Sequence, residues 1–306
     1  MKRNLIFTFL AILSCLLAGA QELNVGTYNI RVDKQEDVIN GNGWQKRCPR
    51  VCELVLHHDF HLFGAQEVEY HQLKDMQALL RDYSHIGVAR EDGNEGGEFV
   101  PIFYRRDMLE LLDSGNFWLS ETPEKPSKGW DAECYRICTW GKFKTREGVV
   151  FYHFNTHLDH RGARARERSA RLITAKIAEI AGEANVILTG DFNVGEITDV
   201  YRIFKESDIL DDSYDMASHR LAWMGTANNF DPGIMTVNRL DYIFLSPAAK
   251  VKRYGVLTDS YRDMVGEEDI RLPNFPEEIV FRKCVVRFPS DHYPVMVEIT
   301  FGTNAR

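Results

Sequence analysis

Four side chains with the chemistry to bind a metal or activate water stand directly after apolar stretches of the sequence. Each stretch is a short apolar run typical of a β-strand, and the end of a strand is rigid enough to aim a side chain into a cleft. Asn and Asp also form turns after strands by bonding their own backbone, so each residue alone has a structural explanation. The four residues are Asn29, Glu67, Asp191 and Asn193.

Another strand-like segment alternates polar and apolar residues from 153 to 159. Because successive side chains of a strand point to opposite faces, His153, Asn155, His157 and Asp159 share one face. A polar face on an interior sheet indicates a site, whereas a polar face on an edge strand is merely solvated. The alternation fits both explanations, so His157 and Asp159 become site candidates only together with the residues above.

Two segments near the C-terminal end combine a histidine with carboxylates. Asp291 and His292 precede an apolar run that ends at Phe301, and Asp241 opens another predicted strand. An aspartate that bonds one imidazole nitrogen fixes the tautomer of the ring and raises its basicity. Asp241 and His292 are therefore expected to form an oriented acid/base pair.

Arginines that follow the polar strand are candidates to bind a substrate phosphate. Arg161 lies in the loop after that strand, and Arg166 falls near the apolar side of a predicted helix. Three neighbouring arginines lie opposite the apolar stripe of this helix, on a face that is expected to be solvated. Arg161 and Arg166 are therefore the better phosphate candidates, and Arg136 in a polar stretch is a weaker one.

Helices and strands are expected to interleave along the chain, which is typical of an α/β architecture. Two polar segments without periodicity, 207–230 and 260–276, are expected to be long loops. No linker rich in Pro, Gly or Ser divides the chain, so residues 21–306 are expected to form one domain. Helices are predicted at 47–57, 73–80 and 163–181, and strands at 23–31, 62–66, 100–104, 109–118, 138–156, 186–188, 240–245 and 295–301.

The composition is that of an ordinary globular protein with an acidic balance of charge. The 306 residues are 44% hydrophobic and carry a formal net charge of -8, and they contain no repeat or low-complexity run. This composition excludes a collagen-like, disordered or solenoid chain. The acidity also weighs against a protein dedicated to duplex nucleic acid, because such affinity comes largely from basic residues that neutralise phosphates.

The first twenty residues have the pattern of a secretory signal peptide. Two basic residues precede an apolar stretch that ends in small residues at Ala20, and the stretch is too short to span a bilayer comfortably. Cleavage after Ala20 removes two basic residues and no acidic one, which takes the net charge from -8 to -10. Lipid attachment at Cys15 is less favoured, because the residues before it form an imperfect lipobox. The protein is expected to be exported to the periplasm or outside the cell.

Six short motifs, in this order along the chain, resemble those of the endonuclease/exonuclease/phosphatase superfamily. Each motif is weak alone, but six in register over nearly the whole mature chain are a strong signal. Two longer stretches, at 117–123 and 155–166, are similar to a secreted bacterial branch related to the deadenylase and nocturnin group. The motifs are T-Y-N-I-R at 27–31, Q-E at 66–67, N-T-H-L-D-H at 155–160, G-D-F-N at 190–193, R-L-D-Y-I-F at 239–244 and S-D-H-Y-P-V at 290–295.

The resemblance implies a four-layer, deoxyribonuclease-I-like fold, in which two mixed β-sheets pack together with helices on the outside. It also implies a divalent-metal phosphoesterase site at one end of this sandwich. By this resemblance, Glu67 is similar to the principal metal ligand, with Asn29 beside it and Asp291 completing the surroundings of the ion. Carboxylate oxygens suit Mg²⁺, with Mn²⁺ as the alternative, and either ion would keep several waters.

The same resemblance implies roles for the remaining residues. Asp191 is similar to the residue that orients or deprotonates the attacking water, and Asn193 to a donor that binds phosphoryl oxygens. His157 and His292, the latter paired with Asp241, are expected to stabilise the charge of the transition state. Hydrolysis is expected to be direct, without a covalent intermediate. The residues expected to bind the substrate are Arg161, Arg166 and Asp159.

The resemblance leaves the substrate open, because one fold serves several phosphoesters. A nucleic acid or nucleotide is slightly favoured, and the alternatives are a phospholipid headgroup, as for sphingomyelinases, and a small sugar or inositol phosphate. A non-catalytic binding module on the same fold is an alternative of another class, which the intact set of site residues argues against. No stable protein partner is expected, and the chain is expected to be a monomer.

Overall fold

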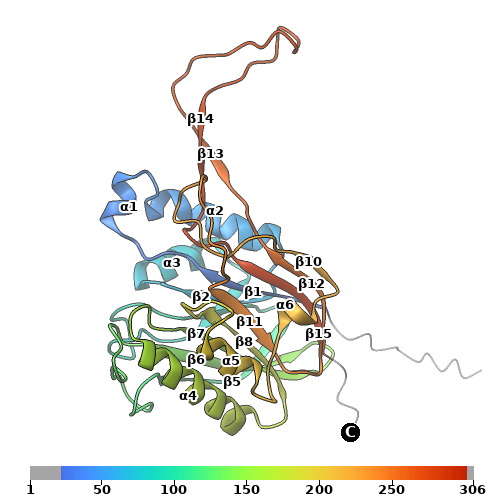
Figure 1. The fold of residues 1–306 in the computed structure, drawn as a ribbon. Helices are drawn as coiled ribbons and strands as arrows, with labels where there is room; N and C mark the ends of the chain where they lie inside the picture. The colour runs from blue at the N-terminus through green and yellow to red at the C-terminus, as the bar shows by residue number, and fades with distance from the viewer. Residues whose placement is uncertain (1–21, 302–306) are drawn as a thin grey trace, which may run out of the picture.

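The computed structural model describes residues 22–301 and contains two large β-sheets that face each other, with helices on their outer sides (Figure 1). This arrangement confirms the four-layer fold predicted from the sequence. The predicted signal peptide, residues 1–20, lies outside the described residues. Within residues 22–301, none of the helices has the length and hydropathy needed to cross a membrane.

In the first sheet, Asn29 and Gln66 lie side by side at the carboxyl ends of two central strands, because these strands are parallel and in register. The residue after Gln66 is Glu67, so two of the predicted metal-site residues are neighbours. From one edge to the other, the seven strands are β10 (His219–Leu221), β12 (Ala249–Val256), β15 (Val295–Phe301), β1 (Leu23–Asn29), β2 (Leu62–Gln66), β4 (Ile102–Arg105) and β3 (Tyr83–Ile86).

The second sheet brings His157, Asp191 and Asp241 together. His157 pairs with Asp191 across two parallel strands, and Asp241 pairs with Asp191 from the antiparallel strand on the other side. All three residues therefore lie side by side at the same end of these three strands. From one edge to the other, its six strands are β5 (Leu109–Trp118), β6 (Ile137–Thr145), β7 (Val150–His157), β8 (Asn185–Asp191), β11 (Asp241–Leu245) and β9 (Asp211–Asp212).

Helices cover the outer face of each sheet through apolar stripes. Ile173 and Ile177, one helical turn apart, pack against Phe154 and Leu188 on the outer face of the second sheet. The predicted helix at 163–181 agrees with the structure, while the helices predicted at 47–57 and 73–80 each begin three residues earlier. The helices are α1 (Gln35–Ile39), α2 (Trp44–His57), α3 (Tyr70–Leu79), α4 (Ala163–Ala181), α5 (Asp199–Lys205) and α6 (Ser213–Met216).

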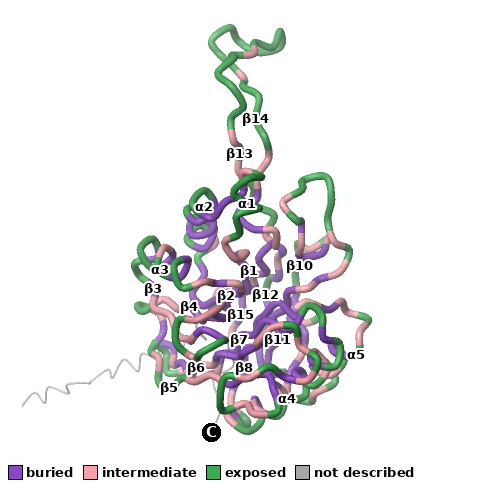
Figure 2. The backbone as a smooth tube through the Cα atoms, turned by 90° about the vertical axis from the view of Figure 1, so that its left-hand side faces the viewer, coloured by how far each residue is buried: buried purple, intermediate pink, exposed green. Residues whose placement is uncertain are grey.

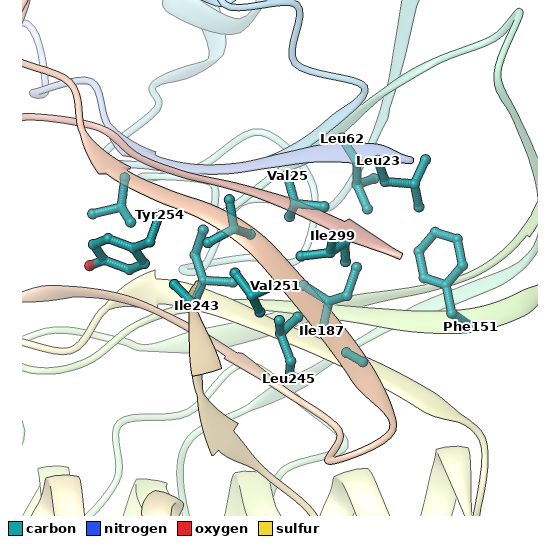
Figure 3. Packing of buried hydrophobic residues seen from close by; sticks show 14 of the residues in the cluster. Leu23, Val25, Leu62, Phe151, Ile187, Ile243, Leu245, Val251, Tyr254 and Ile299 are labelled. Carbon is teal, nitrogen blue, oxygen red and sulfur yellow. The ribbon is translucent and has the colours of Figure 1, made fainter. Parts of the chain in front are cut away.

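The two sheets enclose an apolar core that ends short of the candidate site. Leu23, Val25 and Leu62 of the first sheet share this core with Ile187 and Ile243 of the second, and all five side chains are buried (Figure 3). Burying such a side chain contributes about 1.5–3 kcal/mol to stability. Because β1 and β2 begin in this core, their carboxyl ends lie at the opposite end of the sandwich.

Beyond this core, the interior between the sheets becomes polar. Two side chains of the first sheet and two of the second lie there, and all four are fully buried. Each stands one or two residues before a predicted site residue in the sequence, so they form a layer beneath the site. The four are Thr27, Gln66, Asn155 and Thr189, which precede Asn29, Glu67, His157 and Asp191 respectively.

Hydrogen bonds join these four side chains into one network across the two sheets. Gln66 Nε2 donates to Asn155 Oδ1 at 2.8 Å and to Thr27 Oγ1 at 3.1 Å. Asn155 Nδ2 donates to the Ala65 carbonyl at 2.8 Å, and Thr189 Oγ1 donates to Asn155 Oδ1 at 3.0 Å. An unpaired polar group in the interior would cost about 1–3 kcal/mol. The network therefore determines how the sheets meet at the end that carries the site.

His153 extends this network deeper into the second sheet. Its Nε2 lies 2.7 Å from Thr189 Oγ1. Because the Thr189 hydroxyl donates to Asn155, His153 Nε2 must carry the ring proton and donate this hydrogen bond to Thr189 Oγ1. Burial lowers the pKa of His153 to about 3, so the ring is neutral near pH 7.

Two segments predicted as long loops contain regular structure, so these predictions are wrong. Residues 207–230 contain the short edge strands β9 and β10, one on each sheet, and the short helix α6. Residues 260–276 form the first part of a hairpin whose strands are β13 (Tyr261–Met264) and β14 (Cys284–Arg287). The partner strand lies outside the segment, and the periodicity of one short stretch carries no information about such a partner.

The network leaves no room for a side chain at Gly64. A Cβ atom there would lie 2.2 Å from Asn155 Oδ1 and 2.3 Å from Thr189 Oγ1. We expect Gly64→Ala to lower the free energy of unfolding by about 3 kcal/mol, because the clash separates buried polar partners. Gly255→Ala is the matched control, since its nearest atom lies 3.6 Å away, and it should change stability by less than about 1 kcal/mol. Equal effects in urea unfolding would contradict this role of the network.

The buried, neutral His153 is expected to make stability depend on pH. Its pKa is about 3 in the folded chain against 6.5 without burial, so the folded state binds fewer protons between these values. Stability should therefore fall as the pH falls from 6.5 toward 3, by about 1.4 kcal/mol per pH unit. Between pH 7 and 5, His153→Gln should lose about 2 kcal/mol less than the wild type in urea unfolding. The same pH dependence in both proteins would rule this out.

Candidate active site

The candidate active site is built around the carboxylate of Asp191, at the carboxyl end of β8. Its Oδ2 lies 3.0 Å from Asn29 Nδ2, 3.5 Å from His157 Nε2 and 3.9 Å from His292 Nε2. Its Oδ1 accepts a hydrogen bond from the backbone N–H of Asn193 at 2.9 Å. Burial of the carboxylate raises the pKa of Asp191 to about 7. Residues of both sheets thus converge on one carboxylate oxygen.

His292 and Asp241 form the acid/base pair that was predicted from the sequence. His292 Nδ1 lies 2.8 Å from Asp241 Oδ2. Burial by itself lowers the pKa of His292, but the carboxylates of Asp241 and Asp191 raise it well above its usual value. His292 therefore carries a positive charge at neutral pH and holds it close to Asp191.

His157 lies in a different electrostatic environment and is neutral. Burial, helped by the nearby cations Arg136 and Arg90, lowers the pKa of His157 well below its usual value. Asn193 Nδ2 lies 3.0 Å from His157 Nε2 and also donates to the Leu158 carbonyl at 3.0 Å. Because Nδ2 can only donate, His157 Nε2 accepts this bond and the ring proton lies on Nδ1. Two imidazoles of different charge therefore flank one carboxylate.

The predicted metal-site residues adjoin this cluster. Glu67 Oε1 accepts a hydrogen bond from Asn29 Nδ2, and Oε2 accepts one from the Val32 N–H, both at 3.0 Å. Burial disfavours the charged form of Glu67, but these hydrogen bonds outweigh it and lower the pKa. Asp291 Oδ2 lies 3.1 Å from Arg31 Nη1, and burial raises the pKa of Asp291. Glu67 is therefore the better charged ligand of the two.

The chemistry of these groups fits a hard divalent cation. The carboxylates of Glu67 and Asp291 and the amide oxygen of Asn29 are the kind of ligand that Mg²⁺ and Mn²⁺ take in proteins. Asp191, Asp241 and His292 also bring one ligand atom each to within 4.8 Å of one another. A charged His292 would repel a cation at that second location. The oxygen atoms around Glu67 therefore form the better candidate metal centre.

A turn of unusual conformation directs Glu67 toward the site. Glu67 has a φ of +60°, in the left-handed region that few residues other than glycine adopt. Asn193 has a similar φ of +50° and follows β8 in the same way. Such strained residues persist where the surrounding structure holds them, and they cluster at functional sites.

Arg31, for which the sequence analysis predicted no role, links two parts of the site. Its guanidinium contacts Asp291 as described and also pairs with Asp37 of α1, with Nε 2.9 Å from Oδ2. Its backbone N–H donates to Asn29 Oδ1 at 3.0 Å. Arg31 thereby positions both a carboxylate and an amide of the candidate metal centre.

Arg47, to which no motif of the sequence points, is completely buried on α2. Its Nη1 donates to the carbonyls of Ile30 at 2.6 Å and Pro289 at 3.0 Å, and its Nη2 donates to the Arg31 carbonyl at 3.1 Å. It ties the end of β1 to the segment that leads into His292. The only signal in the sequence is a charged residue on the apolar face of a predicted helix.

Two of the three predicted substrate-binding residues have hydrogen-bond partners within the protein. The carboxylate of Asp159 accepts hydrogen bonds from the backbone N–H groups of Cys134, Arg161 and Gly162 at 3.1, 3.0 and 2.7 Å. Arg166 Nη1 donates to the Asp159 carbonyl at 2.8 Å. The Arg161 side chain is exposed and forms no hydrogen bond or ion pair with residues 22–301. Arg161 is therefore the one that is free to meet a substrate.

A second group of potential ligands is unsuited to a metal. Ligand atoms of Cys134, Asp159 and His160 lie within 4.8 Å of one another. However, the buried guanidinium of Arg136 lies 3.4 Å from Asp159 Oδ2 and 3.2 Å from His160 Nδ1. A fixed positive charge in contact with two of the three groups would repel a cation.

Comparison with known proteins agrees with this geometry. A sequence model of the Endonuclease/Exonuclease/phosphatase family matches residues 26–292. A family protein from Bacteroides thetaiotaomicron is 45% identical, with 94% of this chain and 100% of that chain covered and a TM-score of 0.86. A mannosyl-6-phosphatase from the same organism is 46% identical, with 91% of this chain and 100% of that chain covered and a TM-score of 0.83.

More distant structures share the fold. The catalytic domain of human nocturnin is 20% identical and covers 92% of this chain and 94% of that chain, with a TM-score of 0.64. Members of the family hydrolyse phosphoester bonds and depend on a divalent metal, and the oxygen atoms around Glu67 are the candidate metal centre of this structure. The prediction of a phosphoester-hydrolysing enzyme is therefore confirmed. Because the match spans most of the chain and the site residues assemble at one end of the sandwich, the chain belongs to the Endonuclease/Exonuclease/phosphatase family.

Proposed function

We propose that this enzyme is a divalent-metal-dependent phosphatase that removes the phosphate from a sugar phosphate by direct attack of water. The observation that carries the chemistry is the convergence of Asn29, His157 and His292 on one oxygen of Asp191. Support for the substrate comes from the 46% identity to a mannosyl-6-phosphatase over 91% of this chain. The net charge of -8 also favours a small ester over a polyanion.

This proposal departs from the nucleic acid or nucleotide that the sequence analysis slightly favoured. The likeness to nocturnin, at 20% identity, supports the fold and says nothing of the substrate. The much higher identity to a sugar phosphatase carries more weight, because it extends over nearly the whole chain. A phospholipid headgroup has no comparable support among these relatives.

Asp191 is placed to take a proton from the attacking water. With a pKa of about 7, its carboxylate can accept a proton at neutral pH and release it afterwards. Asn29 bonds one of its oxygens and the Asn193 N–H bonds the other, so the carboxylate is held in place. As the water oxygen bonds to phosphorus, the ester P–O bond breaks and the water proton passes to Asp191. No protein atom becomes bonded to phosphorus.

The charged His292 and the Asn193 amide beside His157 stabilise the charge that builds up during this step. His292, which Asp241 keeps protonated, neutralises charge on the phosphoryl oxygens and supplies a proton to the departing sugar oxygen. Asn193 Nδ2 bonds His157 Nε2 and the Leu158 carbonyl, and when a substrate binds, one of these two N–H groups can turn to a phosphoryl oxygen. Positive charge and hydrogen-bond donors thus surround the position that the phosphate would occupy.

Oxygen atoms of Glu67, Asn29 and Asp291 would hold the divalent ion. A bound Mg²⁺ or Mn²⁺ screens the negative charge of a phosphate group, which favours attack by water. Arg31, beside Asp291, balances part of the acidic charge gathered there. The same three residues were implied by the family resemblance.

We also propose that the enzyme is exported, because its first twenty residues have the pattern of a signal peptide. A phosphate ester carries charge that opposes its passage across a membrane. An enzyme outside the cytoplasm would convert such an ester into a neutral sugar.

With Mg²⁺, the mature protein is expected to release phosphate from mannose 6-phosphate with a kcat/KM at least about 10-fold above that for a nucleotide. Single-stranded RNA, single-stranded DNA and sphingomyelin are tested as further substrates in the same assay. Asp191→Asn should lower kcat about 10³-fold, because the amide keeps the shape of the side chain but cannot accept the proton. Phosphate release under steady-state conditions measures both effects.

The control is Glu147→Gln, which changes an exposed carboxylate between β6 and β7 and should leave kcat unchanged. Faster turnover of a nucleotide or nucleic acid would contradict the assignment of a sugar phosphate as substrate, but it would leave the assignment of the active site intact. Wild-type activity in Asp191→Asn would reject the site itself.

Removal of the metal should abolish activity, and Glu67→Gln should weaken the binding of Mg²⁺. EDTA is expected to stop phosphate release, and excess Mg²⁺ to restore it. Loss of the Glu67 charge should raise the Kd for Mg²⁺ about 10- to 100-fold in isothermal titration calorimetry. Calorimetry needs no substrate, so it tests the metal centre independently of activity. Equal affinities of Glu67→Gln, Glu147→Gln and the wild type would exclude Glu67 as a ligand.

A further inference from the structure

A long hairpin projects from the body of the protein and is mostly exposed (Figures 1 and 2). We call residues 261–288 the arm, which comprises β13, β14 and their connection. Among the strands of residues 22–301, β13 and β14 pair only with each other. Both outer edges of the arm therefore present unpaired backbone N–H and C=O groups, which can pair with another chain.

The arm also exposes apolar side chains to water, although a two-stranded hairpin has no core of its own in which to bury them. A two-stranded hairpin alone is marginally stable, and apolar side chains gathered on an exposed surface mark a contact with another molecule. The arm therefore has the character of an interaction surface. Its exposed apolar side chains include Met264, Leu272, Phe275, Ile279 and Val285.

The charges of the arm are segregated along its length. The distal part, residues 267–278, has five acidic side chains and one basic side chain, a net charge of -4. The proximal part, residues 261–266 and 279–288, has four basic side chains and one acidic side chain, a net charge of +3. The arm residues that form no ion pair within residues 22–301 include Glu267, Glu268, Glu277, Glu278, Arg262 and Lys283.

We propose that the arm pairs in antiparallel orientation with the arm of a second copy of this chain, so that the enzyme is a dimer. A basic partner would be repelled by the proximal part, and a nucleic acid or anionic membrane by the distal part. A second copy in the opposite direction places its proximal part against this distal part, and the two-fold axis repeats the contact. The exposed apolar side chains of both arms then lie along the same contact as the charges.

The arm reaches the active site through its second strand. β14 ends at Arg287, whose Nη1 donates to the Asn40 carbonyl at 2.9 Å and to Asn42 Oδ1 at 3.1 Å. The chain then continues through Ser290 to His292. In the antiparallel dimer, the tip of the partner's arm lies beside this base. The second copy thereby adds an acidic and partly apolar wall next to the active site.

Reversal of the charges in either part of the arm tests the dimer. The mature wild type should sediment with twice the mass of one chain in analytical ultracentrifugation at low salt. Each variant alone should sediment as a monomer, because like charges then face each other at both contacts. An equimolar mixture should recover the dimer mass, because both contacts are again complementary. The variants are Glu267→Lys with Glu268→Lys, Glu277→Lys and Glu278→Lys in the distal part, and Arg262→Glu with Lys283→Glu in the proximal part.

Circular dichroism and phosphate release control for folding, since none of the six substituted residues lies in the catalytic or metal centre. A wild type that is monomeric at its highest soluble concentration would overturn the proposal. Dimers in both separate variants, or a mixture that stays monomeric, would do the same. Phosphate release by any of these proteins supports the hydrolytic function independently of the arm.

Discussion

The hydrogen bond between the buried amides of Gln66 and Asn155 joins the two sheets directly beneath the candidate active site. Apolar packing between the sheets is strong but has no direction, so it tolerates small displacements of one sheet across the other. A hydrogen bond between buried amides does not tolerate such a displacement, because the displacement leaves both amides unpaired in the interior. The polar layer therefore sets the relative position of Asn29 on one sheet and of Asp191 on the other, which the site requires.

Four carboxylates lie close together in this site, and their different partners separate their behaviour. Asp241 bonds the imidazole of His292, Asp291 contacts Arg31, and Glu67 accepts bonds from an amide and a backbone N–H. The pKa of Asp191 is raised to about 7, because the effect of burial, which raises it, outweighs that of the hydrogen bonds from Asn29 and the Asn193 N–H, which lower it. Such a separation of neighbouring acids is the usual way in which proteins assign acid and base roles.

One segment near the C-terminal end connects the arm, the buried Arg47 and His292 of the candidate site. It leaves β14 at Arg287, passes Pro289, whose carbonyl bonds Arg47, and reaches His292. A contact made by the arm would thus act on a segment that is anchored within a few residues of the site. Loops and projections of this kind vary among enzymes that share a fold, and they commonly determine substrates and partners.

The amino-acid sequence was enough to indicate the candidate site residues and most of the strands and helices that hold them. Asn29, Glu67 and Asp191 were recognisable because polar side chains end apolar runs, and the helix at 163–181 because its apolar residues repeat at helical spacing. The six short motifs of the sequence were also sufficient to indicate the family.

The packing of the two sheets settled which polar side chains face the candidate site and which bond the surrounding backbone. The tertiary structure assigned the Asp159 carboxylate to three backbone N–H groups and made residues 260–276 part of an arm. The bonds that decide these roles join residues far apart in the chain, such as Asn29 and Asp191, which are separated by 162 positions. Local patterns report the residue types and the period of one element, whereas such contacts exist only after the sheets have packed against each other.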